Sequence, residues 1–123
     1  MAKLDVAAVA GSSGNHVGDT LQITALISVT MADDGSAITG LTEPDFDVYW
    51  HSDDNITSRV QLEVNIVQET ASFPEGGVDG MYFINAFAPG ESTYVLAGVN
   101  FLEVRARSGN DAGQSVARYV VQP

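Results

Sequence analysis

The sequence predicts an all-β fold, on the basis of two alternating segments and one hairpin near the end of the chain. In the segments 20–30 and 60–66, apolar residues occupy alternate positions and mostly polar residues fill the positions between them. The segment 96–121 has the pattern of two strands folded back around a turn of Gly, Asn and Asp. Side chains alternate across a β-strand, so this period is typical of a ribbon with one buried and one solvated face.

The other strands are predicted from shorter alternating runs separated by turn residues. In chain order, strands are expected at 4–8, 20–30, 46–51, 60–66 and 81–88 and in the two arms of the hairpin at 96–121. Turn residues lie between them, for example at Asp33-Asp34-Gly35 and Pro89-Gly90, because glycine reaches positive φ and Asp side chains bond to the backbone of a turn. About seven strands with turns at roughly ten-residue spacing are typical of a β-sandwich.

The size and charge of the chain limit its possible functions. It has 123 residues and no cysteine, so we expect one domain over residues 1–123 without disulfides or zinc–thiolate sites. No run approaches the ~20 apolar residues of a membrane span, and the first residues lack the apolar core of a signal peptide. Sixteen acidic and five basic residues give a net charge of -11. Basic residues scattered on this background exclude nucleic acid and anionic membranes, which need a cationic footprint.

Three motifs resemble parts of bacterial immunoglobulin-like and hyalin-repeat domains. The segment 96–106 (LAGVNFLEVRA), followed by Gly113, is similar to their closing hairpin. The segment 40–48 (GLTEPDFDV) resembles the entry to a middle strand, and 79–83 (DGMYF) resembles a strand start with an acid, a glycine and a tyrosine. The resemblance implies a single immunoglobulin-like Greek-key β-sandwich with a spacer, adhesion or accessory role. It also implies an extracellular, cell-surface or virion location, and it brings no catalytic residues.

Acidic residues in the predicted loops are the candidate metal ligands. Ca²⁺ takes several oxygen ligands, and the end of a sandwich can bring loops together. The candidates are Asp33, Asp34, Asp53, Asp54 and Asp111. None belongs to a loop of the EF-hand type, and Asp is also a common turn former. The sequence therefore leaves two interpretations, a calcium site or solvated carboxylates in turns, and it predicts no other cofactor.

Four ring side chains form the candidate surface for a ligand or partner: Tyr49, His51, Tyr82 and Tyr119. On the outward side of their strands, they would stack against a sugar ring or a protein. The alternative is that each is an isolated surface ring without a ligand. No catalytic site is expected, because the chain lacks a G-x-S-x-G motif and its two histidines fall short of the three ligands usual at a catalytic zinc.

The predicted core follows the apolar side of the strands. Its members are Leu21, Ile23, Ile27, Phe46, Val48, Trp50, Val60, Leu62, Val64, Leu102 and Val104. The first and last strands carry few charges, which usually protect a sheet edge, so we expect one edge to be covered by a second copy, a neighbouring domain or a donated strand. The alternative is a monomer whose acidic surface alone prevents aggregation. The sequence thus predicts a non-catalytic structural or interaction module of a larger bacterial or viral surface assembly. The alternative is an accessory β-sandwich module that binds carbohydrate or calcium.

Overall fold

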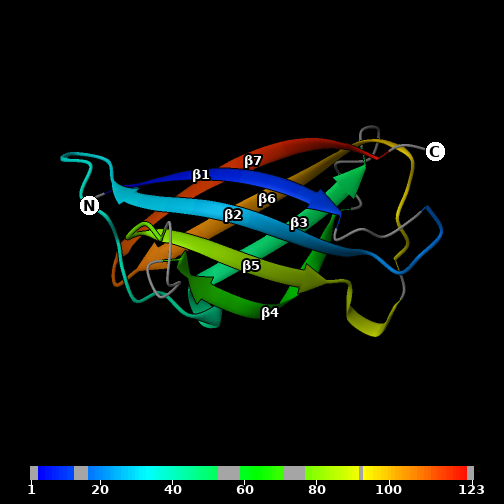
Figure 1. Cartoon of the computed structure of the whole chain (residues 1–123), viewed down its shortest axis with the longest axis horizontal. Helices are drawn as coiled ribbons and strands as arrows, with labels where there is room; N and C mark the ends of the chain where they lie inside the picture. The colour runs from blue at the N-terminus through cyan, green and yellow to red at the C-terminus, as the bar shows by residue number, and fades with distance from the viewer. Residues whose placement is uncertain (1–2, 13–16, 53–58, 71–76, 92, 122–123) are drawn as a thin grey trace.

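Seven antiparallel strands form one nearly closed, barrel-like sheet (Figure 1). The computed structural model describes residues 3–12, 17–52, 59–70, 77–91 and 93–121. The strands are β1 (Leu4–Ser12), β2 (Gln22–Met31), β3 (Phe46–Ser52), β4 (Val60–Glu69), β5 (Met81–Phe87), β6 (Gly98–Ser108) and β7 (Asp111–Val121). Within the described residues, the connections include the short 3-10 helices η1 (Glu43–Asp45) and η4 (Pro89–Glu91). The predicted all-β class is confirmed. Within the described residues, no helix is long and apolar enough to cross a membrane.

In the strand order β1-β2-β5-β4-β3-β6-β7, β4 is the central strand. The sheet bends at β4, so that its two halves face each other across the core. Residues 60–62 of this strand pair with β3, whereas the strand from Glu63 onward pairs with β5. The register shifts between Val64 and Ile66, and such a bulge bends a strand and increases its twist. Strand β4 therefore belongs to both halves of the sheet, the β1-β2-β5 half and the β3-β6-β7 half.

The first and last strands lie side by side and close most of the remaining gap (Figure 1). Lys3 and Ala112 form an isolated parallel bridge. Gly113 packs directly on the backbone of β1, since a Cβ atom at this position would overlap the Leu4 carbonyl oxygen. The edges of these terminal strands face each other, although only the isolated bridge between Lys3 and Ala112 pairs them in the described residues. A partner that covers one of them stays a prediction.

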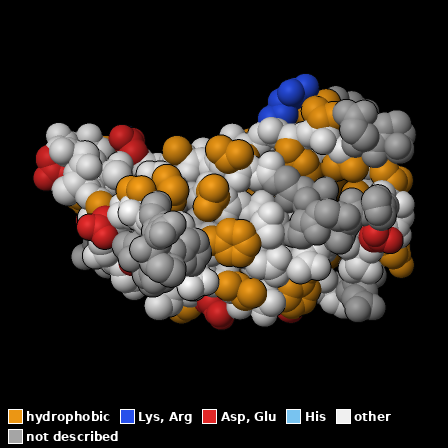
Figure 2. Space-filling view, viewed as in Figure 1, with side chains coloured by type: hydrophobic (Ala, Val, Ile, Leu, Met, Phe, Trp, Pro, Cys, Tyr) orange, Lys and Arg blue, Asp and Glu red, His pale blue; other side chains and the backbone are white. Residues whose placement is uncertain are grey.

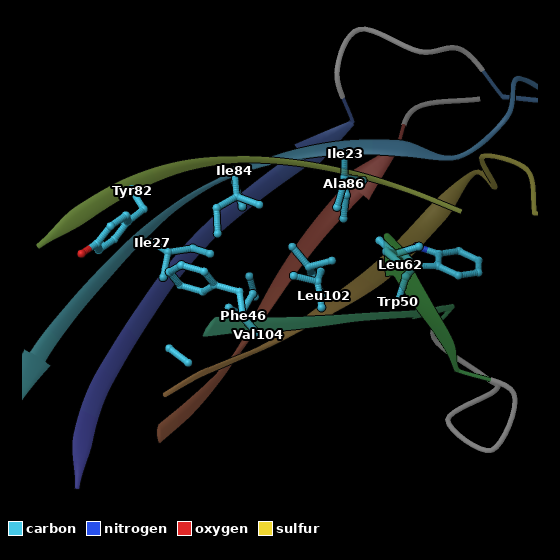
Figure 3. Close-up of a cluster of buried hydrophobic side chains, with 14 of the residues drawn as sticks. Ile23, Ile27, Phe46, Trp50, Leu62, Tyr82, Ile84, Ala86, Leu102 and Val104 are labelled. Atoms are coloured by element: carbon cyan, nitrogen blue, oxygen red, sulfur yellow. The ribbon is translucent and has the colours of Figure 1, made fainter. Parts of the chain in front are cut away.

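The core fills the space between the two halves of the sheet (Figure 3). The predicted core residues that are buried are Leu21, Ile23, Ile27, Phe46, Val48, Trp50, Leu62, Leu102 and Val104. Val60 and Val64 are only partly buried, and both lie close to the bend of β4. Strand β5 adds three buried side chains that the sequence did not assign to the core, namely Tyr82, Ile84 and Ala86.

Candidate functional site

Tyr82, which the sequence predicts on the outside, is completely buried. Its ring meets the Phe46 ring edge to face, with 5.4 Å between the centroids. Its hydroxyl donates to the Ile38 carbonyl oxygen at 2.6 Å and accepts from the Leu41 amide at 3.2 Å, and burial raises the pKa of this hydroxyl. The predicted outward position is wrong because Tyr82 lies on the same side of β5 as Ile84. Its hydroxyl instead ties the loop between β2 and η1 to the core.

Removal of this hydroxyl should destabilise the fold. We expect Tyr82→Phe to lower the free energy of unfolding by about 1–3 kcal/mol, because the buried Leu41 amide loses its acceptor. Tyr94→Phe is the control, since Tyr94 is 53% exposed and its loss should stay within about 0.5 kcal/mol. Urea denaturation measures both values, and equal losses in the two variants would contradict the role of the Tyr82 hydroxyl.

Tyr119 is also buried, so its predicted outward position is wrong. It lies on the same side of β7 as Ala117 and Val121, and all three face the core. Burial raises the pKa of the Tyr119 hydroxyl to about 12, and the neighbouring Trp50 side chain offsets part of this rise. This tyrosine therefore stays protonated at neutral pH and contributes to packing.

His51 lies on the outer side of β3 but is covered there. Its ring stacks on the Phe101 ring with 5.0 Å between centroids, and its Nδ1 lies 2.9 Å from the Ser52 carbonyl oxygen. A carbonyl accepts only from a protonated nitrogen, so this contact favours the tautomer with hydrogen on Nδ1. The expectation of an exposed His51 is wrong, because the neighbouring strand β6 supplies an aromatic cover.

Tyr49 lies on the outer face of β3 between two arginines. The guanidinium carbons of Arg59 and Arg105 are 4.6 and 5.0 Å from the centroid of its ring. Arg59 donates to Glu103 Oε2 at 2.7 Å, and Arg105 donates to Glu103 Oε1 from Nε at 3.1 Å and from Nη2 at 2.9 Å. Tyr49 is therefore part of a charged cluster with cation–π contacts, and two guanidinium groups already lie against its ring.

Most of the basic residues gather on the outside of the β3-β6-β7 half of the sheet. We call this surface the arginine face, and its members are Arg59, Arg105, Arg107 and Arg118. Arg107 donates from Nη1 to Asp47 at 2.6 Å and from Nη2 to the Pro44 carbonyl oxygen at 2.6 Å. The bond from Arg107 holds the pKa of the Asp47 carboxyl below its usual value. The description of the positive charge as scattered is wrong, because strand pairing brings four of the five basic residues together.

The candidate calcium ligands do not form a cluster in the described residues. Asp33 and Asp34 lie in the turn after β2, where Asp34 Oδ1 accepts from the Ser36 hydroxyl at 2.7 Å and amide at 2.9 Å. These bonds hold the pKa of Asp34 below its usual value. Asp111 begins β7, and the pair at 53–54 lies outside the described residues. No group of three or more His, Asp or Glu side chains suited to a metal ion occurs in the part of the chain that the structure describes.

An open groove of about 590 Å³ lies beside η1. Its described lining includes two carboxylates, Glu43 and Glu63, together with Phe46, Gln61 and Pro89. None of the described lining residues is a histidine, a serine or a basic residue.

The outer face of β1, β2 and β5 is apolar and exposed. The strand register places Val9 opposite Leu26, and Leu26 opposite Phe83, so that the three form one row across the sheet. Val9 is 74% exposed and Leu26 is 46% exposed, and a shallow hollow of about 350 Å³ lies over the row. Figure 2 shows hydrophobic side chains gathered over these strands, with most charged side chains toward the margins of the view.

This surface continues along the sheet, and we call it the apolar face. Its members are Ala7, Val9, Leu26, Ile66, Met81 and Phe83. The polar residues among them, such as Thr24 and Ser28, carry no charge. Asp5 and Glu63, the charged positions of these strands on the same side, lie toward opposite ends of the sheet. The fold therefore has an apolar outer surface on one half and an arginine-rich outer surface on the other.

Comparisons of the chain with protein-family models, with curated protein sequences and with solved structures found no match. The resemblance of three motifs to immunoglobulin-like and hyalin-repeat domains therefore stays a prediction.

Proposed function

We propose that the chain is a non-catalytic interaction module of a larger bacterial or viral surface assembly, and that it binds a second copy of itself through the apolar face. The exposed row of Val9, Leu26 and Phe83 carries this proposal. Contiguous exposed apolar surface on a globular domain usually marks a contact site. The three motifs that resemble surface-protein domains support the larger assembly.

The charge of the chain favours contact between two apolar faces. A net charge of -11 keeps copies apart wherever their acidic surfaces meet. The central part of the apolar face is uncharged on all three of the strands β1, β2 and β5. A two-fold contact places the same patch of both copies face to face. A contact through the centre of the apolar face therefore brings no like charges together. The row is short compared with the roughly 20–30 residues a side of a stable interface, and we therefore expect a weak, reversible dimer.

The strand order supports an immunoglobulin-like arrangement. Strands β3, β4 and β5 are neighbours in succession, and β6 returns to lie beside β3. A fourth strand beside the first is the spatial order of a Greek key, which occurs in most β-sandwiches. In this interpretation the two halves of the sheet are the two layers of a sandwich, and their outer faces are the surfaces available to partners.

A carboxylate in the apolar row should prevent the self-contact. We expect the wild-type chain to form a reversible dimer at about 100 μM. Leu26→Glu should remain monomeric, because like charges would be desolvated across the two-fold axis. Sedimentation velocity measures the mass of both proteins.

Val120→Glu is the matched control for this experiment. Val120 is 52% exposed on β7, outside the apolar face, and the substitution adds the same charge. It should dimerise like the wild type. A monomeric wild-type chain at about 1 mM, or equal dissociation by the two substitutions, would contradict the proposed contact.

A further inference from the structure

Another hollow, of about 360 Å³, lies on the arginine face beside β6 and β7. Arg105, Arg107, Asp47 and Gln114 supply its polar lining, and the rest of the lining consists of alanine and glycine. The register places Gln114 opposite Arg105 and the short Ala112 opposite Arg107. The hollow borders both arginines and the short residues Ala112 and Gly113 of β7, and we call it the arginine groove.

Carboxylates beneath the groove hold its two arginines in place. Arg105 is bonded to Glu103 at 2.9 Å, and Arg107 is bonded to Asp47 at 2.6 Å. The side chains of Glu103 and Asp47 are only 13% and 28% exposed, whereas those of Arg105 and Arg107 are 38% and 44% exposed. The guanidinium groups therefore lie nearer to solvent than the carboxylates that bind them. The bonds from Nε and Nη2 of Arg105 leave its Nη1 group for a further acceptor.

Within the described residues, two arginines share the carboxylate of Glu103. Arg59 and Arg105 both bond to Glu103, whereas Arg107 bonds to Asp47 and is also close enough to Asp45 for the two charges to interact. Two like charges held against one carboxylate repel each other, and a further anion would offset this repulsion.

We infer that the arginine groove binds a carboxylate side chain from an acidic segment of a partner protein. Arginine presents planar, forked donors that suit a carboxylate, and the same face already makes such contacts with its own Glu103 and Asp47. At physiological salt, charges beyond about 8 Å are largely screened, so the local guanidinium groups dominate the contact. A long polyanion would reach the acidic surface beyond the groove, so a short acidic segment is the favoured partner.

This site lies on the other half of the sheet from the apolar face. The inference therefore goes beyond the proposed self-contact, and the two can fail separately. Leu26→Glu should leave the arginine groove intact, while substitutions in the groove should leave dimerisation unchanged.

The probe for the groove is a fluorescein-labelled hexaglutamate peptide, and fluorescence polarisation measures its binding to the full chain. We expect Arg105→Gln and Arg107→Gln each to weaken binding by about tenfold, as the loss of a charge-assisted hydrogen bond predicts. Arg118→Gln is the matched control, because it removes the same charge from the same face but outside the groove lining. It should change the affinity by no more than about twofold, since a distant exposed charge contributes little. A labelled hexaglutamine peptide should not bind.

Three results would overturn the inference: no binding of hexaglutamate at about 1 mM, equal losses in all three arginine variants, or preferential binding of a heparin hexasaccharide. The last result would assign the face to a sulfated glycan. Arg107 also bonds to the Pro44 carbonyl oxygen, so its replacement can affect folding. Amide NMR of the wild-type chain avoids this difficulty, because bound peptide should shift the Gln114 side-chain amide and the Arg105 Nε–H. Shifts confined to the apolar face would contradict the site.

Discussion

Gly113→Ala should lower the free energy of unfolding by about 2–4 kcal/mol, at the upper end for overpacking. The new Cβ would overlap the carbonyl oxygen of Leu4, which is a backbone atom. Leu4 is held in turn by its pairing with Met31 in β2, so the obstacle cannot rotate away as the end of a side chain can. Urea denaturation followed by the fluorescence of Trp50, the single tryptophan, measures the loss.

Gly35→Ala is the control for this substitution. Gly35 has a φ of +73° but nothing within 4 Å of its expected Cβ, so its replacement adds backbone strain without a collision. That strain is worth about 1–2 kcal/mol. If Gly113→Ala proved no more damaging than Gly35→Ala, then β1 and β7 would not approach as closely as described.

The contact between β1 and β7 also affects where partners can bind. Sheet edges are the usual sites for added strands, because they expose unpaired backbone groups. Here the two terminal edges face each other, and Gly113 permits their close approach. The outer faces of the sheet are available to partners without opening this seam, and they differ in chemistry between its two halves.

The sequence predicted the strands well where only one side of a strand is apolar. In the segment 20–30, polar residues mark the outer side except at Leu26, and the predicted inner residues Leu21, Ile23 and Ile27 are buried. Strand β5 differs because both of its sides are apolar or aromatic. Tyr82 and Phe83 are equally plausible core residues by composition, so alternation alone could not assign the inward side.

The candidate surfaces depend on strand pairing between distant segments, which local pattern does not specify. Asp47 meets Arg107 only because β3 pairs with β6, and Arg105 borders the same groove as Gln114 only because β6 pairs with β7. The number of basic residues was evident, but their common face was not. Likewise, the outward Tyr49 was predicted, but its position between Arg59 and Arg105 required the fold.

Trp50→Ala should destabilise the fold by about 3–5 kcal/mol, as expected for a large-to-small change in a core. Trp50 is 5% exposed and lies near the point where β3 pairs with the first part of β4 (Figure 3). The cavity would open beside Leu62 and Tyr119. The bend of β4 and the neighbouring strands hold these two side chains in place. Circular dichroism during urea denaturation is the measurement, because this variant lacks the fluorescent reporter.

Tyr49→Ala tests the same strand from its other side. Tyr49 points away from the core toward two exposed arginines, and cation–π contacts at exposed sites contribute about 0.5–1 kcal/mol. We therefore expect a much smaller loss than for Trp50→Ala. Equal losses would mean that the inward side of β3 is assigned wrongly. In that case Asp47, which lies on the same side of β3 as Tyr49, could not border an exposed arginine groove, so the comparison tests the basis of the inferred carboxylate site as well as the core.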